Sequence, residues 1–143
     1  STDDAIVGKS LDGRILSWNH AAETIFGYSA EEIIGCNVRM LIPPDRQIEE
    51  DTIVASIMRG ERVPTFETVR LHKDGSAVNV AVTVSPVLDA NGRVVAASKI
   101  ARDITAQIIK STTDFQMMPF VAQTVDLNEG SCHMKIDFEF VRN

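Results

Sequence analysis

The sequence is poor in cysteine, contains no long apolar run and carries no excess of basic side chains. Its two cysteines, Cys36 and Cys132, are far apart and match no metal-binding spacing. We therefore expect neither a disulfide scaffold nor a metal site, and a reducing compartment is the simpler interpretation. No apolar stretch approaches the ~18 residues of a membrane span. Its 14 basic and 20 acidic residues give a net charge of −6, which argues against nucleic acid as a partner. We expect a cytoplasmic segment that contacts neither nucleic acid nor membrane.

Recognisable catalytic patterns are also missing. No Ser/His/Asp or Cys/His set has a familiar spacing, and there is no glycine-rich phosphate loop. The acidic runs Glu31-Glu32 and Glu49-Glu50-Asp51 fall on expected helices, where neighbouring side chains diverge by about 100° and do not converge on one metal or substrate. We interpret these runs as solvated acidic faces, and we expect the chain not to be an enzyme.

The most regular stretch runs from Leu71 to Thr105 and predicts antiparallel strands. Its first strand places valines at every second position, which is the pattern of a half-buried strand, at Val78, Val80, Val82 and Val84. The same alternation puts Asn79 and Thr83 on the opposite face, so we expect them outside the core. Turn residues at 89–92 return the chain through a second strand, and the turn at 73–75 adds a third, from about residue 65 to 71.

The first half of the chain predicts a hairpin followed by short helices. Residues 4–9 and 14–18 read as paired strands around an Asp-Gly turn. Asn19 is a suitable N-cap for a helix over residues 20–26, and Gly27 ends it. Ser29 and Glu32 have the spacing of a capping box, which opens a second short helix.

A longer helix is expected from an Asp45 cap to about Arg59, before Gly60. Its apolar residues predict a buried side made of Ile48, Thr52, Ile53, Ala55, Ile57 and Met58. The charged residues are expected to face water, namely Glu49, Glu50, Asp51 and Arg59.

This order of elements, with its motifs, resembles the PAS domain family of sensory modules. The resemblance covers roughly residues 3–105 and is carried by DDAIVGKSLDGRILSWNHAAETIFGYSAEEIIG at the start, the KDGS turn at 73–76 and the closing Asp103-Ile104-Thr105. It implies an α+β PAS fold, with a five-stranded antiparallel sheet in the order 2-1-5-4-3 and short helices on one face. It also implies a pocket between sheet and helices, which family members use for haem, flavin, small organic acids or nothing.

The residues that would hold a cofactor depart from the family patterns. Residues 35–42 look like the flavin signature of LOV photoreceptors, but Val38 stands where those proteins carry the reactive cysteine, and Cys36 lies two residues earlier. Oxygen-sensing members bind haem through a histidine on the long helix, which has none here; the histidines are His20, His72 and His133. We expect no cofactor, with flavin or haem as alternatives.

The resemblance also assigns candidate site residues. We expect the pocket, where occupied, to be lined by core side chains, namely Ile25, Phe26, Val38, Met40, Ile53, Ile57, Val69, Val80, Val82 and Ile100. In PAS proteins the end of the last strand couples the sheet to a signalling helix. This implies a relay role for Asp103 and Thr105, in which Asp103 accepts hydrogen bonds from Arg or Lys side chains or from nearby amides.

The chain after residue 106 does not follow the family pattern. Ile104, Ile108 and Ile109 begin an apolar helical repeat that Ser111 and the residues up to Pro119 interrupt. Residues 133–141 alternate as a strand, with residues 115–127 as its expected partner. We divide the chain into a PAS sensory domain (1–106) and a β-rich C-terminal extension (107–143), expected as a hairpin that packs on the sheet or on a partner chain.

The sequence thus predicts a non-catalytic sensory module for signal transduction. It would bind a small ligand or a protein partner and relay a conformational change through Asp103-Ile104-Thr105. The output domain would be one such as a histidine kinase of a two-component system or a cyclic-dinucleotide enzyme, and we expect a homodimer. Two alternatives stay open: a structural dimerisation module with a closed core, and a flavin-binding redox sensor without photoadduct chemistry.

Overall fold

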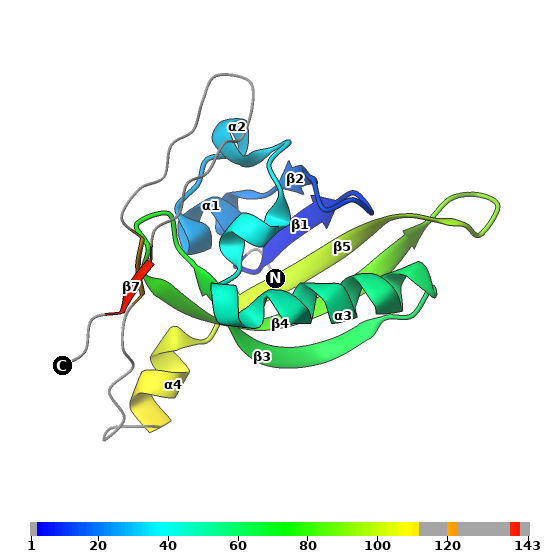
Figure 1. Ribbon diagram of the computed structural model, residues 1–143. Helices are drawn as coiled ribbons and strands as arrows, with labels where there is room; N and C mark the ends of the chain where they lie inside the picture. The colour runs from blue at the N-terminus through cyan, green and yellow to red at the C-terminus, as the bar shows by residue number, and fades with distance from the viewer. Residues whose placement is uncertain (1–2, 112–119, 123–137, 141–143) are drawn as a thin grey trace.

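The computed structural model describes residues 3–111, 120–122 and 138–140 (Figure 1). No helix among these residues is long and apolar enough to cross a membrane. The elements, with η for a 3-10 helix, are β1 (Ala5–Lys9), β2 (Ile15–Trp18), α1 (His20–Phe26), α2 (Ala30–Ile33), η1 (Val38–Leu41), η2 (Pro44–Arg46), α3 (Gln47–Met58), β3 (Val63–Leu71), β4 (Ala77–Leu88), β5 (Val94–Asp103), α4 (Thr105–Ser111), β6 (Phe120–Ala122) and β7 (Phe138–Phe140).

Five strands form one antiparallel sheet in the order β2-β1-β5-β4-β3, which confirms the expected topology. The helix α3 lies across this sheet and contacts β3, β4 and β5 (Figure 1). The predicted valine face is buried in the core, at Val78, Val80, Val82 and Val84. The central strand is β5, with β1 and β4 on either side of it, and inward-pointing residues of β1 and β5 are buried even where they are charged, at Lys9 and Lys99.

The two short helices begin where the sequence predicts, and α1 also ends there. Asn19 Oδ1 accepts hydrogen bonds from the amides of Ala22 and Ile6, each at 3.0 Å, so one side chain caps α1 and ties it to β1. Gly27 ends α1 with a φ of 82°. The capping box of Ser29 and Glu32 is present at the start of α2.

The orientation of α3 corrects the prediction made for it. The helix begins at Gln47 after the η2 turn, without a side-chain cap from Asp45. Ile48 and Met58 are 71% and 58% exposed, whereas Glu50 is 1% exposed. At about 100° per residue, Glu50 lies on the same side as Ile53 and Ile57, three and seven positions later. The expectation that Glu50 faces water is therefore wrong, because the helix turns this side to the sheet.

Asn79 provides a second correction. It was expected outside the core but is 4% exposed. Its amide and carbonyl both pair with the segment that follows β5: its carbonyl accepts from the amide of Ile104 at 2.8 Å, and its amide donates to Thr105 Oγ1 at 3.1 Å. The junction between β5 and α4 therefore closes over this part of β4. Thr83 is half-buried, and its hydroxyl lies 2.6 Å from that of Thr65.

The described part of the C-terminal extension is a short strand pair. In this pair, β6 and β7 run antiparallel, with Phe120 opposite Phe140 and Ala122 opposite Phe138. Residues 112–119, 123–137 and 141–143 lie outside the described residues. The expected turn of this hairpin and its packing on the sheet therefore stay predictions, as does the division of the chain at residue 106.

Candidate functional site

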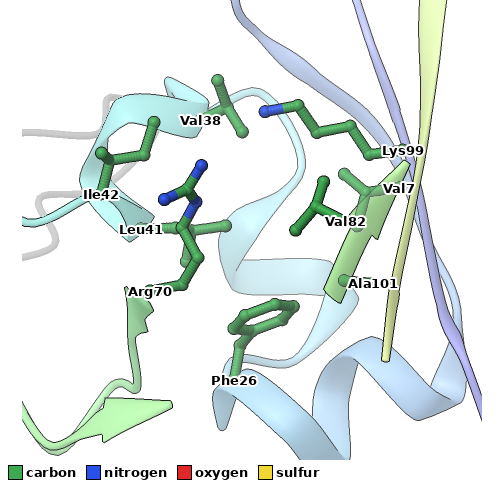
Figure 2. A pocket seen from close by; sticks show the side chains of 9 residues that line it. All are labelled: Val7, Phe26, Val38, Leu41, Ile42, Arg70, Val82, Lys99 and Ala101. Atoms are coloured by element: carbon green, nitrogen blue, oxygen red, sulfur yellow. The ribbon is translucent and has the colours of Figure 1, made fainter. Parts of the chain in front are cut away.

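A small cavity lies between the sheet and the helices. Its free volume is about 30 Å³, and it is lined by Val7, Phe26, Val38, Leu41, Ile42, Arg70, Val82, Lys99 and Ala101 (Figure 2). A volume of this size holds on the order of one or two waters. Seven of the nine lining side chains are apolar, and the remaining two are cationic. The cavity therefore offers positive charge within apolar walls, and a flavin or haem would enter only if the walls moved.

The expected lining residues divide into three groups. Phe26, Val38 and Val82 line the cavity. Five others are buried in the surrounding core without lining it, at Ile25, Met40, Ile53, Ile57 and Val80. The structure places Val69 and Ile100 on the outer face of the sheet, and Ile100 is 43% exposed.

Strand alternation explains the outward position of Ile100 and Val69. Successive side chains point to opposite faces, so Ile100 alternates with Lys99 and Ala101, and Val69 alternates with Arg70. Sequence reasoning missed Arg70 and Lys99 because charged residues are seldom buried without a partner. Counting the alternation of each strand from the buried valines of β4 would have placed both side chains on the inner face of the sheet.

Arg70 is 4% exposed and only partly bonded. Its Nη1 donates to Glu49 Oε1 and to its neighbour's carbonyl, Val69 O, both at 2.9 Å. Its Nη2 is buried and has no hydrogen-bond partner among the described residues. Burial alone would raise the pKa of the Glu49 carboxyl, but hydrogen bonds from Thr68 and Arg70 lower it, so Glu49 stays an anion beside Arg70. One end of the guanidinium is thus paired and the other is not.

Two lysines meet one carboxylate beside the cavity. Glu50 binds Lys99 Nζ through Oε2 at 2.9 Å and Lys9 Nζ through Oε1. Burial alone would raise the pKa of Glu50, but the ammonium groups of Lys99 and Lys9 outweigh it and lower the pKa to about 2. Burial lowers the pKa of Lys99 to about 8, although Glu50 opposes that shift. The group carries two positive charges and one negative charge when all three are ionised.

The two expected relay residues lie at the joint between β5 and α4. Asp103 Oδ1 accepts a hydrogen bond from the Thr105 amide at 2.9 Å, which fixes the first turn of α4. Thr105 Oγ1 in turn accepts from the amide of Asn79. Lys99 and Ala101, on the same strand, line the cavity. The cavity wall and the joint are therefore consecutive parts of β5.

Residues considered for cofactor chemistry lie elsewhere. Cys36 is fully buried and does not line the cavity. His20 lies 3.4 Å from Glu23 with an exposed side chain, and His72 lies beside a hairpin turn; neither lines the cavity.

Residues 1–104 match the PAS family, described as the PAS fold. The chain belongs to the PAS family. Among solved structures, it is similar to a PAS domain from Colwellia psychrerythraea, with 35% identity, a TM-score of 0.68 and coverage of 73% of this chain and 88% of that one. It is also similar to an RNA-binding light-oxygen-voltage receptor, with 26% identity, a TM-score of 0.65 and coverage of 76% and 32%.

Curated relatives of this PAS domain are signalling proteins. The chain is 37% identical over 59% of its length to the C4-dicarboxylate transport sensor protein DctS of Rhodobacter capsulatus, and 33% identical over 72% to the two-component system protein A of Emericella nidulans. A blue-light-activated histidine kinase of Brucella anthropi is 28% identical over 69% of this chain. The matches span 13%, 15% and 20% of those proteins. This PAS domain is accordingly a signal-transduction module.

Proposed function

We propose that this PAS domain senses a small ligand in the cavity and passes the change through the β5–α4 joint to an output domain. The observation that carries the proposal is the continuity of β5 between the two sites. Lys99 and Ala101 line the cavity, and Asp103 and Thr105 follow two and four residues after Ala101. A displacement of this short strand segment at the cavity would therefore also displace the joint.

The neighbouring strand β4 also connects the cavity with the β5–α4 joint. Val82 lines the cavity and pairs with Ala101, while Val80 pairs with Asp103. Asn79, the next residue towards the start of β4, holds Ile104 and Thr105 through its backbone. A ligand that shifts β5 against β4 would change these hydrogen bonds and, with them, the direction in which α4 leaves the sheet.

The domain acts in this proposal without catalysis of its own. Relatives named as a transport sensor, a two-component protein and a histidine kinase support a histidine kinase as the output domain, and a cyclic-dinucleotide enzyme is the other choice. We place the domain in the cytoplasm, as part of a homodimer.

A structural dimerisation module is the second candidate function. Several apolar side chains are exposed on strands of the sheet, at Ile6, Leu16, Val95 and Ile100. Ile6 pairs with Ile100 across β1 and β5, so these two side chains are neighbours on one face. A flavin redox sensor has less support because the cavity is small, and a yellow purified protein would favour it.

The test joins residues 1–111 to a dimeric histidine kinase core and measures autophosphorylation. Thr105→Val keeps the shape of the side chain but removes the acceptor of the Asn79 amide. We expect it to change the basal rate at least threefold. Thr52→Val is the matched control, because Thr52 is an exposed helical threonine whose hydroxyl bonds only locally, to Ile48 O at 3.1 Å. Equal rates for Thr105→Val and Thr52→Val would contradict the relay.

A further inference from the structure

Two buried ammonium groups share one buried carboxylate. Glu50 is 1% exposed, Lys9 2% and Lys99 7%. Glu50 Oε1 accepts a hydrogen bond from Lys9 Nζ, and Oε2 accepts one from Lys99 Nζ at 2.9 Å. The three side chains come from three elements, α3, β1 and β5. With all three groups ionised, one positive charge of the group is left without an anion, and such a charge is costly to bury.

The surroundings of Lys99 add to this excess of positive charge. Its ammonium has three N–H groups, and Glu50 is its only hydrogen-bond acceptor among the described residues. Three charged side chains face it from the elements packed around it, namely Glu50 of α3, Lys9 of β1 and Arg70 of β3. The carboxylate of Glu49, also on α3, pairs with Arg70 at 2.9 Å. The strand β4 and the η1 turn add apolar walls, at Val82 and Val38 (Figure 2).

Loss of one proton from Lys99 would remove the unbalanced charge. Burial among cations favours the neutral form of an amine. Burial lowers the pKa of Lys99 from its ordinary value of 10.5 to about 8, although Glu50 opposes that shift. A neutral Lys99 can still donate to Glu50 Oε2, but this contact then lacks the attraction between opposite charges. Glu50 would keep one ion pair, with Lys9.

The same proton decides to which strand α3 is held by charge. When Lys99 is ionised, Glu50 ties α3 to both β1 and β5, and when it is neutral the charge pair with β1 remains. Lys99 lies in the central strand, opposite Val7 of β1 and Val84 of β4. Asp103, at the joint with α4, follows four residues later on that strand. The charge of Lys99 is therefore placed to act on the strand that ends at the joint.

We propose that Lys9, Glu50 and Lys99 form a proton-operated switch, in which Lys99 releases its proton in mildly alkaline solution, loosens α3 from β5 and alters the β5–α4 joint. The signal is the pH of the surrounding solution, so this input needs no molecule in the cavity. Only its effect on an output domain rests on the proposed function. The protonated state holds at lower pH, and the switch operates as the pH rises.

The test is a titration of the full chain by 13C NMR between about pH 7 and 10, which spans the expected transition. The Cε resonance of Lys99, identified by its loss in Lys99→Met, reports the protonation of the amine. We expect a midpoint of about 8. Arg70→Gln removes a neighbouring cation and should raise this midpoint. Lys73→Met removes an exposed lysine, bonded to Glu32, and should leave the midpoint of Lys99 unchanged.

The joint is followed in the same titration by the backbone carbon resonances of Asn79 and Ile104. Carbon resonances are suitable because they persist where alkaline exchange broadens amide signals. Both residues should shift with the midpoint of Lys99 in the wild type and in Lys73→Met. The α-amino group titrates in the same range, so the transition at the joint has to disappear in Lys99→Met.

The free energy of unfolding gives an independent check with a defined sign. An unfolded lysine keeps its proton up to about pH 10.5, whereas folded Lys99 loses it at about 8. Between these values the unfolded chain binds more protons, so the free energy of unfolding should rise with pH in the wild type relative to Lys99→Met. Urea denaturation across this range measures the difference. A difference that stays constant would contradict the switch.

The titration has three outcomes that decide the proposal. A Lys99 midpoint at the ordinary value of 10.5, or no transition before the chain unfolds, would overturn the switch. A transition of Lys99 that Asn79 and Ile104 do not follow would overturn it too. A transition shared by Lys99 and the joint would uphold the switch. It would do so even if the kinase fusion gave equal rates for Thr105→Val and Thr52→Val, a result that contradicts only the relay to an output domain.

Discussion

Glu50 Oε2 lies 2.9 Å from Lys99 Nζ in the interior of the domain, where a helix covers the middle of the sheet. The two residues are 49 positions apart in the chain, and both side chains are buried. Lys9 completes the group from the adjacent strand β1, whose Val7 pairs with Lys99. The position of α3 on the sheet is thereby fixed by charge as well as by packing.

Removal of the carboxylate should destabilise the fold strongly. Glu50→Gln leaves Lys9 and Lys99 buried without an anion, which costs about 3–5 kcal/mol for a buried pair that loses one partner. Asp51→Asn is the control on the neighbouring position, since its partner Arg39 and Asp51 itself are both solvent-accessible and such pairs contribute about 0–1 kcal/mol. Urea denaturation of the two variants measures the difference. Similar denaturation midpoints for the two variants would mean that the buried Glu50 group does not stabilise the fold.

The same carboxylate predicts how stability depends on pH. The folded-state pKa of Glu50 is about 2, below its ordinary value of 4.5. The contribution of the Glu50 carboxylate to the free energy of unfolding is therefore complete above pH 4.5. It is lost as the pH falls toward 2, and the loss for the full pKa shift is on the order of 3 kcal/mol. Urea denaturation at several pH values in this window should show a steeper decline for the wild type than for Glu50→Gln. Parallel declines would contradict the low pKa.

Gly27 should tolerate alanine poorly for two separate reasons. Its φ is +82°, and a Cβ at this position would clash with the ring of His72. Gly35 has a similar φ of +92° with nothing near its Cβ, so Gly35→Ala measures the backbone strain alone, about 1 kcal/mol. We expect Gly27→Ala to cost clearly more. Urea denaturation measures this extra destabilisation of Gly27→Ala over Gly35→Ala, which should become smaller in a His72→Ala background. An extra destabilisation that persists there would show that the His72 ring does not cause it.

The hydrogen bond of Thr105 should limit local unfolding of the first turn of α4. Thr105→Val removes one hydrogen bond to the Asn79 amide, worth about 1 kcal/mol, which corresponds to roughly fivefold faster exchange of amides in the first turn of α4. The Ile108 amide, bonded to Ile104 O at 3.1 Å, is a direct reporter. Exchange in β1 serves as the internal reference. Unchanged protection at Ile108 would show that the hydroxyl does not hold the joint.

Local sequence patterns predicted the elements well, because short-range physics decides them. The cap at Asn19, the capping box of Ser29 and Glu32 and the valine face of β4 each follow from neighbours a few residues apart. The order of the strands came from the resemblance to a family, since periodicity does not specify which strands pair. The start of α3 lies one residue later than predicted, because the η2 turn precedes it and Arg46 takes the cap position in place of Asp45.

The charged interior escaped prediction because it depends on partners distant in sequence. A lysine on a strand is normally exposed, but Lys99 points into the core and forms an ion pair with Glu50 of α3, 49 positions earlier in the chain. Arg70 is likewise inside because strand alternation, set by the pairing of β3 with β4, turns it inward. Those pairings fix which face each residue takes, and with it which side chains reach the cavity.

Amide hydrogen exchange of the full chain, compared between Val82→Ala and Val84→Ala, tests most directly whether cavity and joint are coupled. Both valines are buried on β4, but of the two only Val82 lines the cavity. We expect Val82→Ala to change exchange at Ile104 and Ile108 severalfold relative to exchange in β1, and Val84→Ala to leave both amides unchanged on the same scale. Equal changes in the two variants would contradict the proposal that this PAS domain passes a change at the cavity to α4.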